Sequence, residues 1–421
     1  IDSPVTAPAG LTAQVQVYSG VLHETHDLVT YQSVGVTRGI TLHYDSLRAE
    51  PRYTYTFLLD DIAAGRSDRR LIVSLSAVGT DEEGAPVTVQ AAGIHPTDEE
   101  KWGTQPNDPV TADEITEKGI VEGDNFFTLP TGGGSVAAGL QIDMTEAGTG
   151  LYTFLLQHGI FTWDGEKFAG ERTLRASVFP VVNTTGSVFG AGWGIEGYLE
   201  IYQGAGGVLM VDGNGSETIF LAPTEPGGQY TPAGGDRSIL KLVGDHYERT
   251  TLDGTVYRFN ARNKLAAVTD RNGNVTTYTY DGETLTGIVD PVGLVTEFTY
   301  DGHGNVSCVK DPAGRCTYLL YEEVFDEDGT SMGWNLVTIT DPDDIRRTLK
   351  YGVEYVDTYG NTDEFRHLLV AQTHKRGNDA LEKLAADFRE TFTYDFAGRI
   401  VGGIRVDGKS FALESAQTRP L

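Results

Sequence analysis

The sequence predicts an all-β protein in which an immunoglobulin-like β-sandwich is inserted ahead of a curved sheet of repeated hairpins. Three observations lead to this class. An Asp-rich turn and a tyrosine at a strand end recur together about every 20 residues, and such a period marks a repeat architecture. β-branched and aromatic residues alternate with a period of two in the strands between the turns. The 421 residues also include 52 glycines, which suits short strands joined by tight turns.

The repeats are clearest between residues 270 and 321. Their turns begin at Asp270, Asp290 and Asp311, and their strands end at Tyr280, Tyr300 and Tyr321. Each turn contains a glycine, and two of the turns place a proline before it, as in Pro291-Val292-Gly293. Proline presets φ and glycine accepts a positive φ, so each turn folds the chain back on itself. Each unit is therefore predicted to be a strand, a turn and a second strand.

Three stretches resemble the YD repeat of the RHS family, which includes teneurins and the shells of bacterial toxin complexes. They are Tyr280-Asp281-Gly282, Tyr300-Asp301-Gly302-His303-Gly304-Asn305 and Tyr394-Asp395-Phe396-Ala397-Gly398-Arg399. In this family many repeats spiral into a large hollow shell. The four or five units in this chain are too few to close one. The resemblance therefore implies a partial RHS shell with unpaired sheet edges, and we expect self-association or a longer chain.

The stretch 183–195 is similar to the motif with which the family's chain begins its shell, although Val188 stands where proline is usual. Glycines in this motif let backbone segments approach closely, and a tryptophan supplies one large apolar side chain. The residues that carry the motif are Phe189, Gly190, Gly192 and Trp193. An earlier stretch, 17–46, resembles the opening segment of bacterial RHS proteins, with His43 where arginine is usual.

These patterns predict four regions. Residues 1–48 form an N-terminal linker and an RHS-type opening segment, residues 49–182 form the β-sandwich, residues 183–260 form the strands that lead into the repeat core, and residues 261–421 form the YD repeats with insertions and a loose tail. Several short strand-like runs separated by Gly, Asp and Pro clusters indicate the sandwich.

Three segments fall outside these patterns. The polar, acidic stretch 96–130 is predicted to be a long loop, and 378–390 a short helix or irregular insertion. Residues 415–421 are predicted to be a loose tail.

The net charge of −28 limits the partners. Phosphate binding needs a basic surface, so nucleic acid is excluded as a partner. No apolar run reaches the length of a membrane-spanning helix. The chain begins at Ile1 without a visible signal peptide, as a processed product or a fragment does. We expect a secreted or cell-surface protein.

The two cysteines, Cys308 and Cys316, flank the turn of one repeat hairpin. Across such a turn they either face one another or lie diagonally on one side of the hairpin. A disulfide in an oxidising compartment and two buried thiols both fit this arrangement.

Asp326 and Asp328 lie in an acidic turn and are candidate calcium ligands, because oxygen-rich turns suit a hard cation. Aspartate and glycine are also what turns need for themselves, and this second interpretation is favoured. No other cofactor is indicated. The sequence contains no nucleophile elbow and no phosphate-binding loop, so no enzyme is predicted.

The sequence thus predicts a non-enzymatic, extracellular or cell-surface structural protein that acts through assembly or adhesion. Its expected partners are itself, the rest of a longer chain, or cell-surface and glycan partners. One alternative is a fragment of an RHS shell that encloses a toxin. Another is a carbohydrate-binding surface protein, because exposed tyrosine and tryptophan rings stack on sugars.

Overall fold

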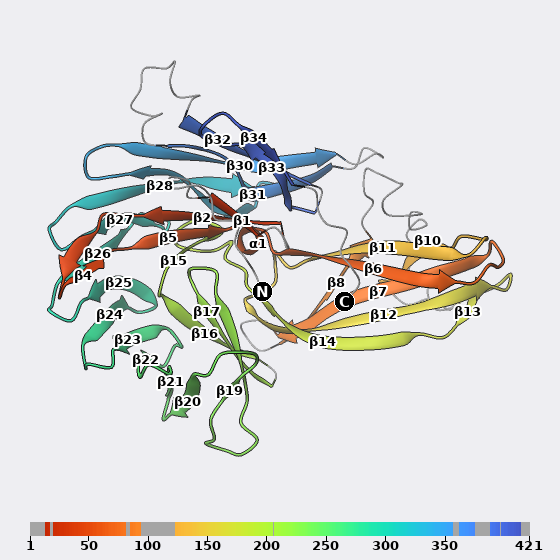
Figure 1. Cartoon of the computed structure of the whole chain (residues 1–421), viewed down its shortest axis with the longest axis horizontal. Helices are drawn as coiled ribbons and strands as arrows, with labels where there is room; N and C mark the ends of the chain where they lie inside the picture. Colours follow the sequence, from red (N-terminus) through yellow and green to blue (C-terminus); the bar gives the residue numbers. More distant parts are fainter. Residues whose placement is uncertain are drawn as a thin grey trace. The chain divides into compact units, whose positions relative to one another are not determined.

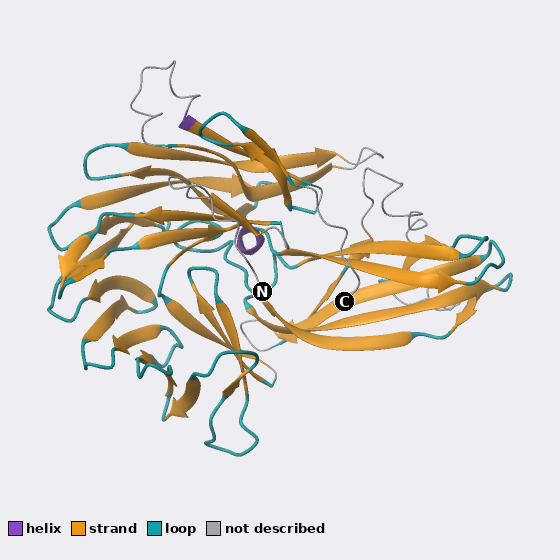
Figure 2. Cartoon of the chain, viewed as in Figure 1, coloured by secondary structure: helices purple, strands orange, loops and turns teal. Residues whose placement is uncertain are grey.

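The computed structural model describes residues 13–16, 20–80, 85–93, 123–204, 206–356, 362–374, 388–395 and 397–413. Strands dominate this part of the chain (Figure 2), and the short α1 (Ser46–Ala49) is its one α-helix. The predicted all-β class is therefore confirmed. Several sequence predictions lie outside the described residues: the linker at 1–10, most of the loop at 96–130, most of the insertion at 378–390, and the tail at 415–421.

The chain divides into two compact units, and each is described by itself. The meander unit comprises residues 1–50, 182–353 and 365–414, and the sandwich unit comprises residues 51–181, 354–364 and 415–421.

The sandwich unit contains two antiparallel sheets that share one core. In the larger sheet, β7 lies between β12 and the shorter strands β10 and β8, while β13 and β14 pair with the other side of β12. The smaller sheet has the order β6-β11-β9. Buried residues of β7, β11 and β12, such as Val73, Leu140 and Leu156, form the common core. The strands are β6 (Arg52–Ile62), β7 (Arg69–Thr80), β8 (Pro86–Gln90), β9 (Ala92–Gly93), β10 (Asn125–Thr128), β11 (Gly134–Asp143), β12 (Gly150–Trp163), β13 (Phe168–Gly170) and β14 (Thr173–Val181).

One part of the predicted loop is a strand. Residues 125–128, assigned by the sequence to the loop at 96–130, form β10 and pair with β7. Phe126 and Phe127 are both buried, in two different apolar clusters of the unit. Two apolar residues inside a polar stretch are too short a run to show a periodicity, which is why the strand was not predicted.

The meander unit is built on a fifteen-stranded antiparallel sheet, the meander, in which the strands follow one another in sequence order (Figure 1). Its strands are β20 (Ile239–Val243), β21 (His246–Thr250), β22 (Val256–Phe259), β23 (Leu265–Thr269), β24 (Val275–Asp281), β25 (Thr284–Val289), β26 (Val295–Tyr300), β27 (Val306–Lys310), β28 (Cys316–Phe325), β29 (Ser331–Thr340), β30 (Arg346–Val356), β31 (Thr362–Thr373), β32 (Arg389–Tyr394), β33 (Ile400–Ile404) and β34 (Ser410–Ala412). Residues 389 and 390, predicted as part of the insertion, thus belong to β32.

Two smaller sheets pack against one face of the meander, which is called the covered face below; the opposite face is the open face. The first sheet, β1-β2-β5-β15, shares a core with strands from β25 to β33. The second sheet, β16-β17-β18-β19, shares a core with the first strands of the meander. A separate hairpin joins β3 to β4. The strands are β1 (Ala13–Gln16), β2 (Val21–Asp27), β3 (Tyr31–Ser33), β4 (Val36–Arg38), β5 (Thr41–Asp45), β15 (Trp193–Ile195), β16 (Leu199–Gly204), β17 (Gly207–Asp212), β18 (Glu217–Leu221) and β19 (Thr231–Pro232).

Candidate functional site

The aspartates of the repeats build the turns. In the turn that follows β26, Oδ1 of Asp301 accepts hydrogen bonds from the backbone N–H of His303 and of Asn305, at 2.8 and 3.0 Å. The Asp301 N–H donates to the carbonyl of Asn305, and Gly304, at φ 91°, donates to the carbonyl of Asp301. The same pattern recurs at Asn260, Asp270, Asp290, Asp311, Asp326 and Asp395.

Asp281 differs from the other repeat aspartates. It is exposed at the end of β24, where it pairs with Thr284 across a two-residue turn that contains Gly282 at φ 63°. The Tyr-Asp dipeptide therefore begins two kinds of turn in this chain. At Asp301 it begins a five-residue turn closed by the carboxylate, and at Asp281 it begins a shorter turn.

The tyrosines of the repeats form a ladder on the covered face. Each hydroxyl donates to a backbone carbonyl of the preceding hairpin, 15 residues earlier in four cases and 25 in the fifth. The pairs are Tyr280 with Leu265, Tyr300 with Leu285, Tyr321 with Val306, Tyr351 with Leu336 and Tyr394 with Leu369, at 2.5 to 2.9 Å. Burial raises the pKa of Tyr280 and of Tyr300 to about 12, so both hydroxyls keep the proton that they donate.

The first four acceptor carbonyls lie at β-bulges. Tyr300, for example, pairs with Val306 while its neighbour Thr299 pairs with Cys308, so Ser307 is an extra residue in the partner strand. A bulge leaves backbone groups without a ladder partner. The tyrosine of the next repeat satisfies the bulge carbonyl, and the Ser307 hydroxyl donates to the Thr299 carbonyl at 3.2 Å. The ladder thus fixes the register of successive hairpins.

The bulges also hold the segments that cover the meander. The N–H of Val306 donates to the carbonyl of Val188 at 2.8 Å, and the N–H of Ile400 donates to the carbonyl of Gly20 at 2.9 Å. The repeats and the segments before them are therefore joined by backbone hydrogen bonds at the irregular points of the sheet.

The motif of Phe189, Gly190, Gly192 and Trp193, called the Gly-Trp motif below, packs against the covered face. A Cβ on Gly190 would lie 2.8 Å from the backbone nitrogen of Leu336, and a Cβ on Gly192 would lie 2.6 Å from the Tyr44 ring. Both glycines also have positive φ, at 94° and 80°. Trp193 is 1% exposed, and its Nε1 donates to the Tyr351 hydroxyl at 2.8 Å. The motif therefore connects directly to the tyrosine ladder.

Sequence reasoning missed Tyr44, which is fully buried beside Trp193 with ring centroids 5.4 Å apart. Its hydroxyl donates to the His367 carbonyl at 2.8 Å and accepts from the Leu369 N–H at 3.0 Å. Its place in the stretch 17–46, which resembles the RHS opening segment, did not indicate these contacts.

His367 was also missed. Its Nδ1 lies 2.8 Å from Oδ1 of Asn335 and its Nε2 lies 3.0 Å from the carbonyl of Met332. Burial lowers the pKa of His367 to about 4.

A buried polar network crosses the same core. Oε1 of Glu24 on β2 accepts from Arg347 on β30 at 3.0 Å, and Arg347 also donates to Gln372. Gln372 donates in turn to Glu390, which pairs with His374 at 3.1 Å. Burial lowers the pKa of Arg347, while the two carboxylates oppose that shift. Hydrogen bonds and one Glu–Arg ion pair thus join β2, β30, β31 and β32.

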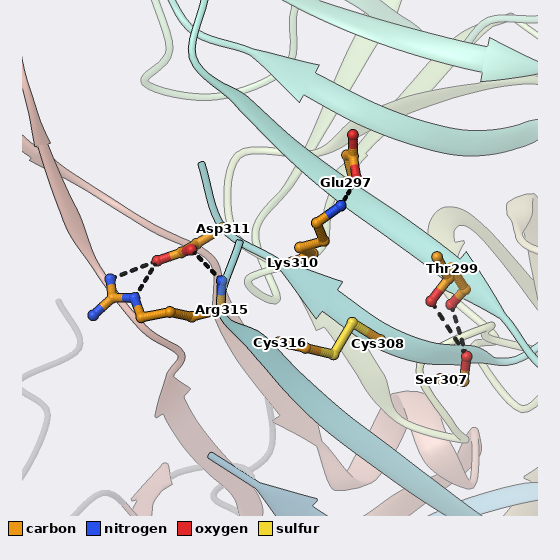
Figure 3. Close-up of a disulfide and its surroundings, with 8 residues drawn as sticks. All are labelled: Glu297, Thr299, Ser307, Cys308, Lys310, Asp311, Arg315 and Cys316. Carbon is orange, nitrogen blue, oxygen red and sulfur yellow. Dashed lines mark hydrogen bonds and ion pairs between the residues drawn. A yellow bond between two sulfur atoms is a disulfide. The ribbon is translucent and has the colours of Figure 1, made fainter. Parts of the chain in front are cut away.

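The two cysteines form a disulfide on the open face of the β27–β28 hairpin, with Cα atoms 5.9 Å apart (Figure 3). Cys308 is directly opposite Tyr318, and Cys316 is opposite Lys310, so the bond is diagonal. The Asp311 side chain at the adjoining turn is held by Arg315, with Nε at 2.7 Å from Oδ2. Burial raises the pKa of Asp311, but hydrogen bonds from Arg315 outweigh it, and the net pKa is lowered.

The calcium candidates do not form a metal cluster. Oδ1 of Asp326 accepts the N–H groups of Asp328 and Thr330, so it builds its own turn, while Asp328 is exposed. Across the described ranges, no group of three or more His, Cys, Asp or Glu side chains is arranged to hold a metal ion. None of the helices in the described part of the chain is long and apolar enough to cross a membrane.

The comparison with family models agrees with the repeat pattern. The RHS repeat family matches residues 259–284 and 282–315. No curated protein matches the sequence. Among solved structures, the chain is similar to one in the crystal structure of TcdB2-TccC3 without its hypervariable C-terminal region, at 12% identity and a TM-score of 0.23. That similarity covers 82% of this chain and 20% of the other, so this chain spans about one fifth of the other chain's length.

Proposed function

Since residues 259–315 match the RHS repeat family, we propose that this chain is a non-enzymatic structural protein, secreted or held at the cell surface, which acts through assembly or adhesion. The observation that carries the proposal is the covered face of the meander. Leu285, Val306 and Leu336 of the repeats share one core with Trp193 and with the strands that precede it. A sheet whose face is filled by its own chain is a solid module, which suits a scaffold.

The chemistry of the repeat side chains supports the same role. The turn aspartates accept backbone N–H groups, the tyrosine hydroxyls donate to backbone carbonyls, and the motif glycines allow close packing. These polar groups are engaged in holding hairpins in register, which is a structural use.

A second candidate is a segment of a longer shell that encloses a toxin. Its support is the match to the RHS repeat family and the last described strand of the meander, β34, whose one neighbour among the described strands is β33. A cargo held by these repeats would need access to the sheet, however, and the covered face is already occupied. We therefore place the scaffold first.

The test is the native mass of the full chain by sedimentation velocity over a wide concentration range, together with binding of the labelled chain to intact cells. The scaffold proposal expects a mass that rises with concentration, or saturable binding to cells. A monomer at every concentration that also fails to bind cells would contradict it. Protease protection of a co-expressed downstream polypeptide would favour the toxin shell, and binding on a glycan array would favour a carbohydrate-binding protein.

A further inference from the structure

The sandwich unit leaves one long strand open along its outer side. β14 pairs with β12 through nine residue pairs, from Gly150 with Val181 to His158 with Thr173. Among the described strands it has no other neighbour. All seven residues from Thr173 to Phe179 are exposed. In Figure 1, β14 runs along the margin of its sheet.

The exposed side chains of β14 are mainly apolar. Leu174 is 59% exposed, Val178 is 50% exposed and Phe179 is 51% exposed. The one charged residue between Thr173 and Val181 is Arg175. A long, regular and apolar edge of this kind is a template for pairing with another strand.

The other edges of the sandwich unit carry the features that prevent such pairing. β13 has only three residues, and β8 begins with Pro86. β6 carries Asp60 and Asp61 near its end, with Asp61 at φ 56°, and its pairing with β11 is interrupted by a bulge. Short length, proline, charge and bulges are the usual protections of an edge strand. The exposed part of β14 has only one of them, the charge of Arg175, so it is the least protected edge among these strands.

We propose that β14 is a dimerisation edge, where a second copy of the chain adds its own β14 in antiparallel orientation about a two-fold axis through Ala176. This deepens the assembly role and rests on it, because it names the surface through which copies associate. Antiparallel pairing about a two-fold axis presents the same surface from both copies, as a closed dimer requires.

The side chains select this register. With the axis at Ala176, Leu174 of one copy lies opposite Val178 of the other, and the two Ala176 residues lie opposite one another. On the other face of the strand pair, Arg175 lies opposite Ser177. Cross-strand apolar pairs of this kind stabilise a sheet, and no like charges are opposed.

Strand pairing with the two-fold axis shifted by one residue is expected to be less stable. An axis at Arg175 would set two guanidinium groups directly opposite one another, which is destabilising. An axis at Ser177 would bring Leu174 opposite Pro180, and proline has no N–H to donate to the ladder.

The local charge permits a second copy as the partner at this strand. Two chains of net charge −28 repel one another over most of their surfaces. A contact between copies is therefore favoured where carboxylates are absent, and residues 173 to 181 contain no acidic residue. The pairing of two short strands buries less than a standard interface of about 1,600 Å². We therefore expect a weak dimer that strengthens when many copies are held on one surface.

The test is a charge exchange at the axis. Ala176→Lys and Ala176→Glu each place two like charges opposite one another, so each variant alone should dimerise at least about tenfold more weakly than the unmodified chain. An equimolar mixture should recover a heterodimer, because lysine then faces glutamate. Ala169→Lys is the matched control, since Ala169 is exposed on β13 of the same sheet, and it should leave dimerisation unchanged. Sedimentation velocity measures the unmodified chain, the three variants and the mixture.

A cysteine variant provides a second readout. Residues opposed across an antiparallel pair are close enough for a disulfide. Ala176→Cys should therefore give a covalent dimer on a non-reducing gel under oxidising conditions, while Ala169→Cys should not.

The outcomes separate this inference from the assembly role. If the chain forms a concentration-dependent dimer that neither charged substitution weakens, and Ala176→Cys gives no cross-link, then dimerisation through β14 is wrong and the assembly role still stands. A chain that stays monomeric at every concentration but binds cells would overturn β14 dimerisation and leave adhesion as the function. Loss of dimer in both single variants with recovery in the mixture supports the edge.

Discussion

The meander and the sandwich are both antiparallel β-structure, but they fix the register of their strands in different ways. In the meander, an aspartate or asparagine sets most hairpin turns and tyrosine hydroxyls satisfy the carbonyls at four of the bulges, so register is determined within a few tens of residues. In the sandwich, long strands such as β7 and β12 are aligned by a shared apolar core. Local hydrogen bonds therefore define one unit, and packing at a distance defines the other.

The same difference extends to the strands at the margins. The first strand of the meander, β20, is bridged at Leu240 to Tyr230, so the meander begins against its own chain. The sandwich leaves β14 without a second neighbour among the described strands. A unit built from repeats is extended by the next repeat in the chain, whereas the proposed extension of the sandwich needs a second molecule.

The largest expected effect is a loss of stability that is confined to the core of the meander unit. Trp193→Ala removes a fully buried ring from the meander unit together with its hydrogen bond to Tyr351. Truncation of a buried aromatic side chain costs about 3–5 kcal/mol. Hydrogen exchange read by mass spectrometry should show faster exchange in β24 to β33 and unchanged exchange in β7 and β12. Equal acceleration in both units would mean that the two cores unfold together.

A pH effect of roughly 3 kcal/mol is expected from His367, which is buried in the meander unit. Its pKa is lowered to about 4 from an ordinary value of 6.5. Between pH 6.5 and pH 4, the His367 ring is protonated in the unfolded chain but stays neutral in the folded chain. The stability from His367 is therefore complete above pH 6.5 and is lost as the pH falls towards 4.

Urea unfolding of the unmodified chain and of His367→Gln between pH 7 and 5 measures this slope. The variant should be less stable but less dependent on pH. Stability that increases towards pH 5 would show instead that the ring is protonated and donates to both Asn335 and Met332.

A smaller effect tests the close packing of the Gly-Trp motif. Gly192→Ala and Gly197→Ala both place a side chain at positive φ, at 80° and 76°. A Cβ on Gly192 meets the Tyr44 ring and Ala49 at 2.6 Å, but a Cβ on Gly197 meets no atom within 4 Å. Overpacking should cost Gly192→Ala about 1–3 kcal/mol more than its control. Similar unfolding free energies for the two variants would mean that backbone strain alone explains the glycines.

The sequence predicted the meander better than the sandwich for the same physical reason. The aspartates at 270, 290 and 311 act on backbone two to four residues away, so their period was visible in the chain. The Tyr300 hydroxyl donates to the carbonyl of Leu285 at a bulge of the preceding hairpin, and the repeat pattern of the sequence did not indicate that partner. Strand β10 was hidden because only its contact with β7 makes it a strand.

Contacts between distant residues were beyond the sequence altogether. Glu24 and Arg347 are 323 positions apart, and so are Tyr44 and His367. Their pairing follows from the packing of the opening segment on the covered face. The family resemblance indicated that Gly192 and Trp193 pack closely, but it did not indicate against which residues.

The smallest expected effect tests the ladder itself. Tyr300→Phe keeps the ring and removes the hydroxyl that donates to Leu285, so a buried carbonyl loses its partner at a cost of about 1–2 kcal/mol. The first repeat shows that the shape is tolerated, because Phe259 occupies the equivalent position beside the bulge at Leu265. Tyr318→Phe is the control, since Tyr318 is 58% exposed on the open face and should change stability by less than about 0.5 kcal/mol. Urea unfolding compares the two, and equal losses would show that the hydroxyls of the ladder do not stabilise the repeats beyond what their rings contribute.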